Sequence, residues 1–297
     1  MDTESIVVCD EEINYLLENI NYVEGTAEEL AFVTDYVEIT RILQELYQWY
    51  QIAKFNLNSL KNVSGTTNVI AANSYMIGLL GAGKNLNELM KICMIQFYGE
   101  DSKEYERFNE DYVKKEYDDS FSYRLLLRLR NFSQHCHIPI SFQNDSFCFD
   151  LAQIYNTPHY NYNKTVREQA EKLMEDVKKK TKRNLTLALA PTVASYMCSL
   201  YKIFKSFLES IRFVLIEKET NLFNMIKEQP ELIEHPNCPD YNDVFWYIIQ
   251  EFPEQLHAII TSEKPQELLS FWLNDVVDAY KEERKSLKKM TNMMEPI

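Results

Sequence analysis

Arg130, Asn131 and His135 stand together in the order Arg-Asn-x-x-x-His, and their side chains could act jointly on a phosphate group. Arginine supplies a permanent cation that binds phosphate through several N–H donors. Histidine titrates near neutral pH and can therefore give or take a proton, and the asparagine amide can orient either neighbour. This trio predicts a catalytic site that holds a phosphodiester and moves a proton beside it.

The trio falls on a stretch that predicts an amphipathic helix from about residue 120 to 136, which Pro139 ends because proline restricts the residue before it. Apolar side chains are expected on one side of this helix: Leu125, Leu126, Leu129 and Phe132. A polar stripe is expected on the other side: Arg124, Arg128, Asn131 and His135. Arg130 would lie about 140° from His135, so it would reach the site through its long side chain or from a second subunit.

Charge is unevenly distributed along the chain, whose formal net charge is −14. Residues 124–217 hold 14 basic and 8 acidic side chains, whereas the segments before and after are both net acidic. A local basic field is what a nucleic-acid backbone meets at contact. We therefore expect the protein to bind particular RNAs rather than to bind nucleic acids non-specifically. The expected substrate contacts are Arg124 and Arg128 on the motif helix, with Lys180, Lys182 and Arg183 on a charged helix over residues 165–183.

The pattern predicts a mainly α-helical fold with few long loops, since the chain has only six glycines and nine prolines. Helices are expected over about 10–60, 69–98 and 187–228, with a turn at Ser64–Thr67. Alternating apolar residues on either side of residues 143–146 predict one β-hairpin within 138–151. The proline-rich segment 230–239 suggests a boundary between a helical domain over 1–228 and a small helical C-terminal region over 229–297, with Phe271 and Trp272 on its buried side.

No feature of the sequence predicts export or membrane insertion. The chain opens with acidic residues where a signal peptide would be basic, and no apolar run reaches the length of a membrane span. The six cysteines are widely spaced and contain no Cys-x-x-Cys pair, which is typical of reduced thiols. We therefore expect a cytoplasmic protein that has no contact with membranes and needs no cofactor.

The motif resembles the Arg-x4–6-His signature of the HEPN superfamily, in which Asn often follows the Arg as it does here. The surrounding runs 117–124 and 129–140 are similar to an uncharacterised bacterial group with this motif, over about 25 residues, with looser similarity to about residue 215. The resemblance implies an α-helical, commonly dimeric, metal-independent endoribonuclease of a toxin–antitoxin or antiviral system. It implies that Arg130 binds the scissile phosphate, His135 acts as acid or base, and Asn131 orients one of them. An antitoxin or sensor protein would be a further partner. His137 stands where some members carry a regulatory Tyr.

Four alternatives remain open at this point. The basic helix face could simply pack against the acidic N-terminal region. It could also belong to a non-catalytic binding protein that recognises an acidic partner or a nucleotide. Residues 78–84 fit the first part of a P-loop, but Asn85 replaces the Ser or Thr that would hold magnesium, so a glycine-containing helix end or close helix crossing is the favoured interpretation. A zinc site at residues 135–137 with Cys148 has no usual ligand spacing.

Overall fold

A computed structural model describes residues 27–135, 139–151, 168, 186–227 and 265–293 of the chain. The chain divides into two compact units, residues 1–43 with 213–268 and residues 44–212 with 269–297. In the first unit, Ile39, Ile42 and Leu43 are buried residues of one helix and Leu215 of another. The second unit contains every contact discussed below.

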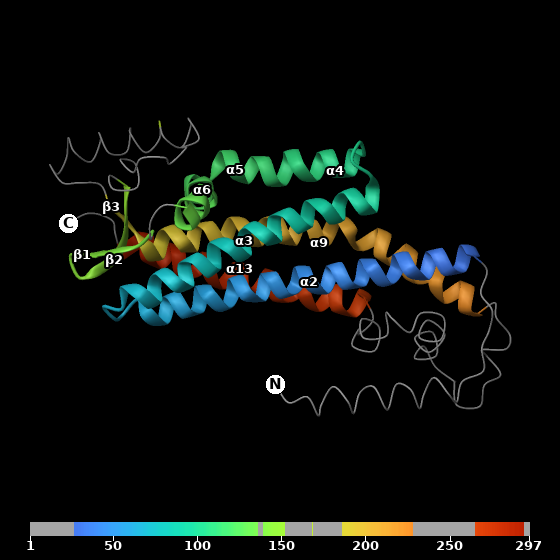
Figure 1. Cartoon of the computed structure of the whole chain (residues 1–297), viewed down its shortest axis with the longest axis horizontal. Helices are drawn as coiled ribbons and strands as arrows, with labels where there is room; N and C mark the ends of the chain where they lie inside the picture. Colours follow the sequence, from blue (N-terminus) through green and yellow to red (C-terminus); the bar gives the residue numbers. More distant parts are fainter. Residues whose placement is uncertain (1–26, 136–138, 152–167, 169–185, 228–264, 294–297) are drawn as a thin grey trace, which may run out of the picture. The chain divides into compact units, whose positions relative to one another are not determined.

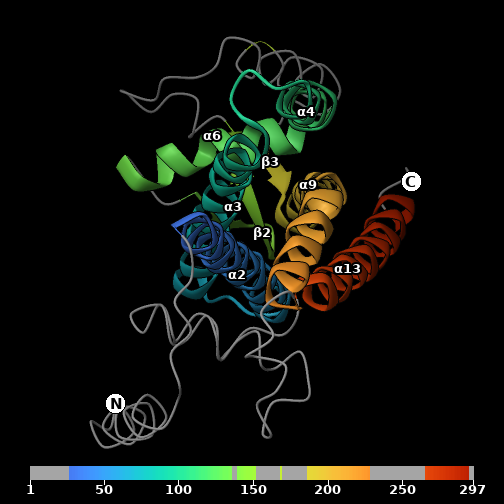
Figure 2. The same ribbon diagram turned by 90° about the vertical axis from the view of Figure 1, so that its right-hand side faces the viewer.

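Four long helices supply most of the described structure: α2 (Ala27–Val63), α3 (Val69–Tyr98), α9 (Leu189–Lys227) and α13 (Pro265–Met293). Their segments in the second unit lie side by side as a bundle (Figures 1 and 2). The mainly helical fold predicted from the sequence is confirmed. The division at residue 228 stays a prediction, since residues 228–264 lie outside the described part of the chain.

The order of contacts gives the direction of each helix in the bundle. Tyr47 stacks on Trp272 with ring centroids 4.7 Å apart, and further along both helices Lys54 pairs with Asp275, so α2 and α13 run parallel. Helices α3 and α9 also run parallel, because Gly83 approaches Tyr196 and Tyr98 donates to the Ser210 carbonyl. A parallel pair needs a long crossover, and residues 99–188 supply it.

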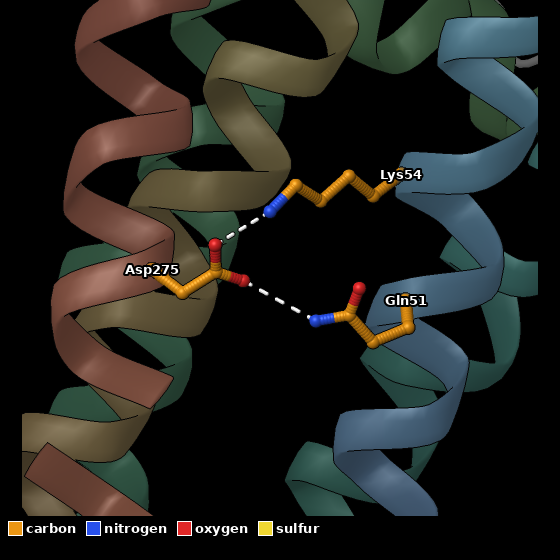
Figure 3. A network of polar contacts seen from close by, with 3 residues as sticks. All are labelled: Gln51, Lys54 and Asp275. Carbon is orange, nitrogen blue, oxygen red and sulfur yellow. Dashed lines mark hydrogen bonds and ion pairs between the residues drawn. The ribbon is translucent and has the colours of Figure 1, made fainter. Parts of the chain in front are cut away.

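Aromatic side chains fill the centre of the bundle, as the abundance of Tyr and Phe suggests. Tyr50 of α2 contacts Tyr201 and Phe204 of α9 at ring-centroid distances of 5.9 and 5.1 Å, and all three side chains are buried. A polar link lies beside this core: the Asp275 carboxylate accepts from the Lys54 ammonium at 2.5 Å and from the Gln51 amide at 3.2 Å (Figure 3). The link fixes the register of α13 against α2.

Phe271 is placed differently from the prediction. Trp272 is buried as expected, but Phe271 is 61% exposed on the next position of α13 and keeps only an edge contact with Tyr47. Adjacent residues on a helix point about 100° apart, so both cannot face the same core. The predicted C-terminal region therefore has only Trp272 of this pair on its buried side.

The crossover between α3 and α9 begins with a continuous helical arm. The arm comprises α4 (Lys103–Arg107), a π-helix η1 (Phe108–Lys114) and α5 (Lys115–Asp119). The buried Phe108 ring meets Phe207 of α9 edge-on at 6.0 Å, and Glu116 accepts from Lys202 of α9 at 2.7 Å. These contacts dock the arm on the bundle. Helix α6 (Phe121–His135) follows directly.

A three-stranded antiparallel sheet completes the described fold, in the order β1 (Ser141–Gln143), β2 (Ser146–Asp150) and β3 (Thr186–Ala188). The predicted hairpin is confirmed: Asn144 and Asp145 form its turn with φ of 49° and 59°. Both residue types tolerate this left-handed conformation. The third strand was not predicted, because residues 187–188 were assigned to the helix that begins at Leu189.

Candidate functional site

Helix α6 contains the whole predicted motif, since it extends from Phe121 to His135. Its apolar side is buried as predicted, with Leu125, Leu126 and Leu129 almost inaccessible to solvent. The helix packs on α3, whose Asn73 is hydrogen-bonded to the backbone of Ile140. The Asn73 amide donates to the Ile140 carbonyl at 2.9 Å, and its oxygen accepts from the Ile140 N–H at 2.8 Å.

Arg124, the first residue of the predicted polar stripe, is buried. Its side chain is 4% exposed, and its Nη1 donates to the carbonyls of Tyr117 and Asp118 at the end of α5. Terminal carbonyls of a helix need such donors because no later N–H of the helix reaches them. The guanidinium also lies over the Tyr117 ring, 5.9 Å from its centroid. Arg124 thus joins α5 to α6, and its predicted substrate contact has no support from this geometry.

Arg128 lies on a cavity of about 410 Å³, here called the cationic cavity. Its lining includes four cationic side chains and one carboxylate: Lys84, Lys91, Lys114, Arg128 and Glu88. Helix α3 contributes one wall, η1 and α5 a second, and α6 a third through Tyr123, Leu127 and Arg128. The cavity therefore collects positive charge from three parts of an acidic chain.

Hydrogen bonds hold several of these charges in place. Lys84 donates to Glu88 at 2.6 Å within α3, and Lys114 donates to Glu110 at 2.6 Å along the arm. Arg128 Nη2 donates to the Tyr117 hydroxyl at 3.3 Å. The last of these hydrogen bonds links α6 to α5 and restricts the conformation of the Arg128 side chain.

Glu88 connects the cationic cavity to the motif arginine. The hydrogen bond from Lys84 lowers the pKa of Glu88 below its ordinary value, against partial burial, and the charges of Lys84, Lys91 and Arg130 lower it further. Arg130, which is half-buried on α6, makes the smallest of these contributions to the pKa of Glu88.

The remaining predicted site residues are placed only in part. Asn131 and His135 belong to α6, but the placement of their side chains lies outside the described part of the structure. Lys180, Lys182 and Arg183 also lie outside it, as do Cys136 and His137 of the zinc alternative. Cys148, the fourth residue of that alternative, is buried on β2. The structure places Arg128 on the cationic cavity and leaves the contacts of the other predicted site residues as predictions.

Sequence reasoning missed the cationic cavity. Lys84, Glu88 and Lys91 recur at positions i, i+4 and i+7 of α3, a spacing that places them on one helix face. That signal was visible in the sequence, but its relation to Arg128 depends on the packing of α6 and on the π-helix. A π-helix is rare and occurs often at functional sites.

The P-loop alternative is overturned. Residues 78–84 lie in the interior of α3, so no loop is present to surround a phosphate. The glycines serve packing instead: a Cβ on Gly83 would lie 2.0 Å from the Tyr196 hydroxyl, and one on Gly78 would lie 2.7 Å from Asn56 Oδ1. A glycine-containing close helix crossing, the favoured interpretation of this segment, is confirmed.

A second cavity of about 470 Å³ lies where the ends of α2 and α13 meet the start of α9. Its lining is mainly apolar, with Leu57, Leu60 and Phe147 among its residues, and its buried Glu283 already accepts from Lys61. It lacks the concentration of cations that a phosphate requires. In the described ranges, no three His, Cys, Asp or Glu side chains cluster as metal ligands.

Comparison with known proteins identifies no relative: no family model, no curated protein and no solved structure matches the chain. Among the described helices, none is both long and apolar enough to cross a membrane.

Proposed function

We propose that this chain is a metal-independent endoribonuclease of the HEPN type, with its site on helix α6. The observation that supports the proposal most strongly is the position of the motif helix. Tyr123, Leu127 and Arg128 of this helix line the cationic cavity beside Lys84 and Lys91 of α3. A phosphodiester beside α6 would therefore meet several cations at once.

The proposed reaction is an internal transesterification of RNA. The ribose 2′-oxygen attacks the adjacent phosphorus, the bond from phosphorus to the 5′-oxygen breaks, and the products end in a 2′,3′-cyclic phosphate and a 5′-hydroxyl. Arg130 binds the phosphate and stabilises the charge that develops on it. His135 gives a proton to the leaving oxygen or takes one from the 2′-hydroxyl, and Asn131 orients one of these groups. All three residues belong to α6.

The biological part of the proposal rests on the family resemblance. The active form is a homodimer in the cytoplasm, in which two copies of the motif contribute to one site. An RNA substrate, and an antitoxin or sensor protein that restrains cleavage, are the proposed partners. Bacterial antiviral defence or a toxin–antitoxin module is the proposed setting.

A non-catalytic binding protein is the second candidate function, and the cationic cavity is the observation that favours it. Such a protein would use Lys84, Lys91, Lys114 and Arg128 to hold an anion without any proton transfer. The two candidates differ in what they require of His135. A nuclease needs its imidazole for turnover, whereas a binding protein depends on its lysines and arginines.

The test measures RNA cleavage and RNA binding in parallel for wild type, Arg130→Ala, His135→Ala and the control Arg107→Ala. Arg107 is exposed on α4 and pairs only weakly with Asp111 across 3.8 Å, so its loss leaves the site intact. The nuclease proposal predicts that His135→Ala retains binding and loses cleavage by about 100-fold or more. Equal cleavage by all four folded proteins would refute it.

A further inference from the structure

Positive charge in the cationic cavity exceeds what its own carboxylate neutralises. Lys84 is paired with Glu88 and Lys114 with Glu110, and Lys91 and Arg128 add two further cations to the same space. Like charges repel one another at this range, and the chain as a whole is acidic. An anion in the cavity would remove this repulsion, so the wall charges point to an anionic ligand.

Two buried polar side chains line the same cavity and have no hydrogen bond of normal geometry in the described structure beyond the interaction of one with the other. Asn87 is 7% exposed, yet neither atom of its amide makes a hydrogen bond of normal geometry with the described residues. The hydroxyl of the fully buried Tyr123 also makes none. Buried polar groups are almost always hydrogen-bonded, because burial without a partner costs about 1–3 kcal/mol. These groups come from α3 and α6 and provide one amide and one hydroxyl on a single cavity.

Tyr123 keeps its proton at neutral pH. Burial raises the pKa of the Tyr123 hydroxyl well above 10, and the nearby Tyr196 raises it further, while a side-chain hydrogen bond with Asn87 lowers it. The two rings are stacked with centroids 5.6 Å apart. A neutral hydroxyl can donate to a carbonyl or phosphate oxygen and does not repel an anion.

The size of the cavity suits a small molecule rather than an ion alone. Its volume of about 410 Å³ falls within the range of roughly 300–1,000 Å³ found for small-molecule sites. Tyr117 adds an aromatic ring to the wall, next to Arg128. Cations, an aromatic ring, an amide and a neutral hydroxyl together match a ligand that combines a phosphate with a flat, hydrogen-bonding group.

We propose that the cationic cavity binds a ribonucleoside phosphate, with its phosphate on the four cations of the walls and its nucleoside on Asn87 and Tyr123. The ligand is either a free mononucleotide or one nucleotide of an RNA chain, which share this chemistry. The proposal does not depend on cleavage by Arg130 and His135, because binding can be measured with ligands that cannot be cleaved.

The test is titration calorimetry of the full-length protein with inorganic phosphate, adenosine, each of the four ribonucleoside 5′-monophosphates, and a single-stranded 2′-O-methyl hexanucleotide. The 2′-O-methyl group removes the attacking hydroxyl, so this probe stays intact. Saturable binding of a mononucleotide assigns the cavity to free nucleotides. Saturable binding of the hexanucleotide alone assigns it to one nucleotide of RNA. Either result, with adenosine and phosphate binding at least tenfold more weakly, supports the proposal.

Substitutions at the cavity and at a control position test where the nucleotide binds. Lys91→Gln/Lys114→Gln should weaken nucleotide binding about tenfold or more, whereas Lys103→Gln, at an exposed position on α4, should not change it. Asn87→Leu removes an amide that makes no hydrogen bond of normal geometry in the described structure, so the fold should tolerate it while nucleotide affinity falls toward that of inorganic phosphate. Melting temperature identifies any variant that fails to fold.

Three results would overturn the proposal. The first is no saturable binding of any mononucleotide or of the hexanucleotide. The second is nucleotide binding that the Lys91→Gln/Lys114→Gln variant retains in full. The third is equal affinity for inorganic phosphate and for nucleotides, which would describe a simple anion site. Loss of RNA cleavage with nucleotide binding intact would refute only the nuclease proposal.

Discussion

Gly83→Ala tests the close crossing of α3 and α9, which positions the wall of the cationic cavity. The new Cβ would lie 2.0 Å from the Tyr196 hydroxyl oxygen and 3.1 Å from its Cζ. Overpacking of this kind costs about 1–3 kcal/mol. Replacing glycine by alanine inside a helix stabilises the folded state by about 1 kcal/mol. The free energy of unfolding should therefore fall by about 1 kcal/mol, and by about 2 kcal/mol relative to the control Gly81→Ala.

Gly81→Ala is a matched control, because a Cβ at Gly81 of the same helix meets nothing within 4 Å. It should raise the unfolding free energy by up to about 1 kcal/mol. Tyr196→Phe removes the clashing oxygen and alone should be nearly neutral, since that buried hydroxyl has no hydrogen-bond partner in the described structure. In the double variant Gly83→Ala/Tyr196→Phe, most of the loss should be recovered.

Urea unfolding followed by circular dichroism gives the four free energies, and thermal melting gives an independent check at about 2–4 °C per kcal/mol. The double-mutant cycle should show a coupling of about 1–2 kcal/mol. Equal stability of Gly83→Ala and Gly81→Ala would refute the close crossing. A Gly83→Ala loss that Tyr196→Phe does not relieve would show that the clash involves another group.

Two further variants and one labelling experiment test other contacts of the structure. Lys61→Ala should lower the unfolding free energy by about 1–3 kcal/mol, because Glu283 is 3% exposed and would lose its cation. Asn73→Ala should lower the free energy of unfolding by about 2–4 kcal/mol, since the buried N–H and C=O of Ile140 would lose their partner. Cys93 should resist alkylation at pH 8 in the native protein, because burial raises the pKa of its thiol to about 12.

Each of these has its own control. Lys84→Ala removes an exposed ion pair and should change stability by less than Lys61→Ala does in the same urea assay. Asn73→Asp keeps the acceptor for the Ile140 N–H, so a loss equal to that of Asn73→Ala would contradict the assigned hydrogen bonds. Peptide mapping after iodoacetamide treatment measures Cys93, and rapid labelling of the native protein would show that its thiol is not buried.

The sequence predicted the elements that local pattern determines. Alternating Phe147 and Phe149 and the turn at residues 144–145 were sufficient for the hairpin, because strand period and turn chemistry agree there. Leu125 and Leu129 identified the buried side of α6 in the same way. The glycines of α3 were more ambiguous, since the same spacing occurs in a phosphate loop.

Features that depend on tertiary packing were not predictable in this way. Arg124 was predicted to contact substrate. Its observed partners, the carbonyls at the end of α5, are backbone groups that are present in any sequence, so the sequence did not reveal them. The cationic cavity needs Lys91 and Arg128 from helices that meet only in the folded chain. The third strand pairs Leu187 with Phe149, which is far away in the sequence, so local sequence pattern does not predict this pairing.

The most direct test of the account is the chemistry of the RNA ends produced by the protein in the presence of EDTA. The account predicts discrete fragments with 2′,3′-cyclic phosphate and 5′-hydroxyl ends from wild type, and none from Arg130→Ala or His135→Ala of equal melting temperature. Fragments with 3′-hydroxyl ends, cleavage that EDTA abolishes, or full activity of His135→Ala would contradict it.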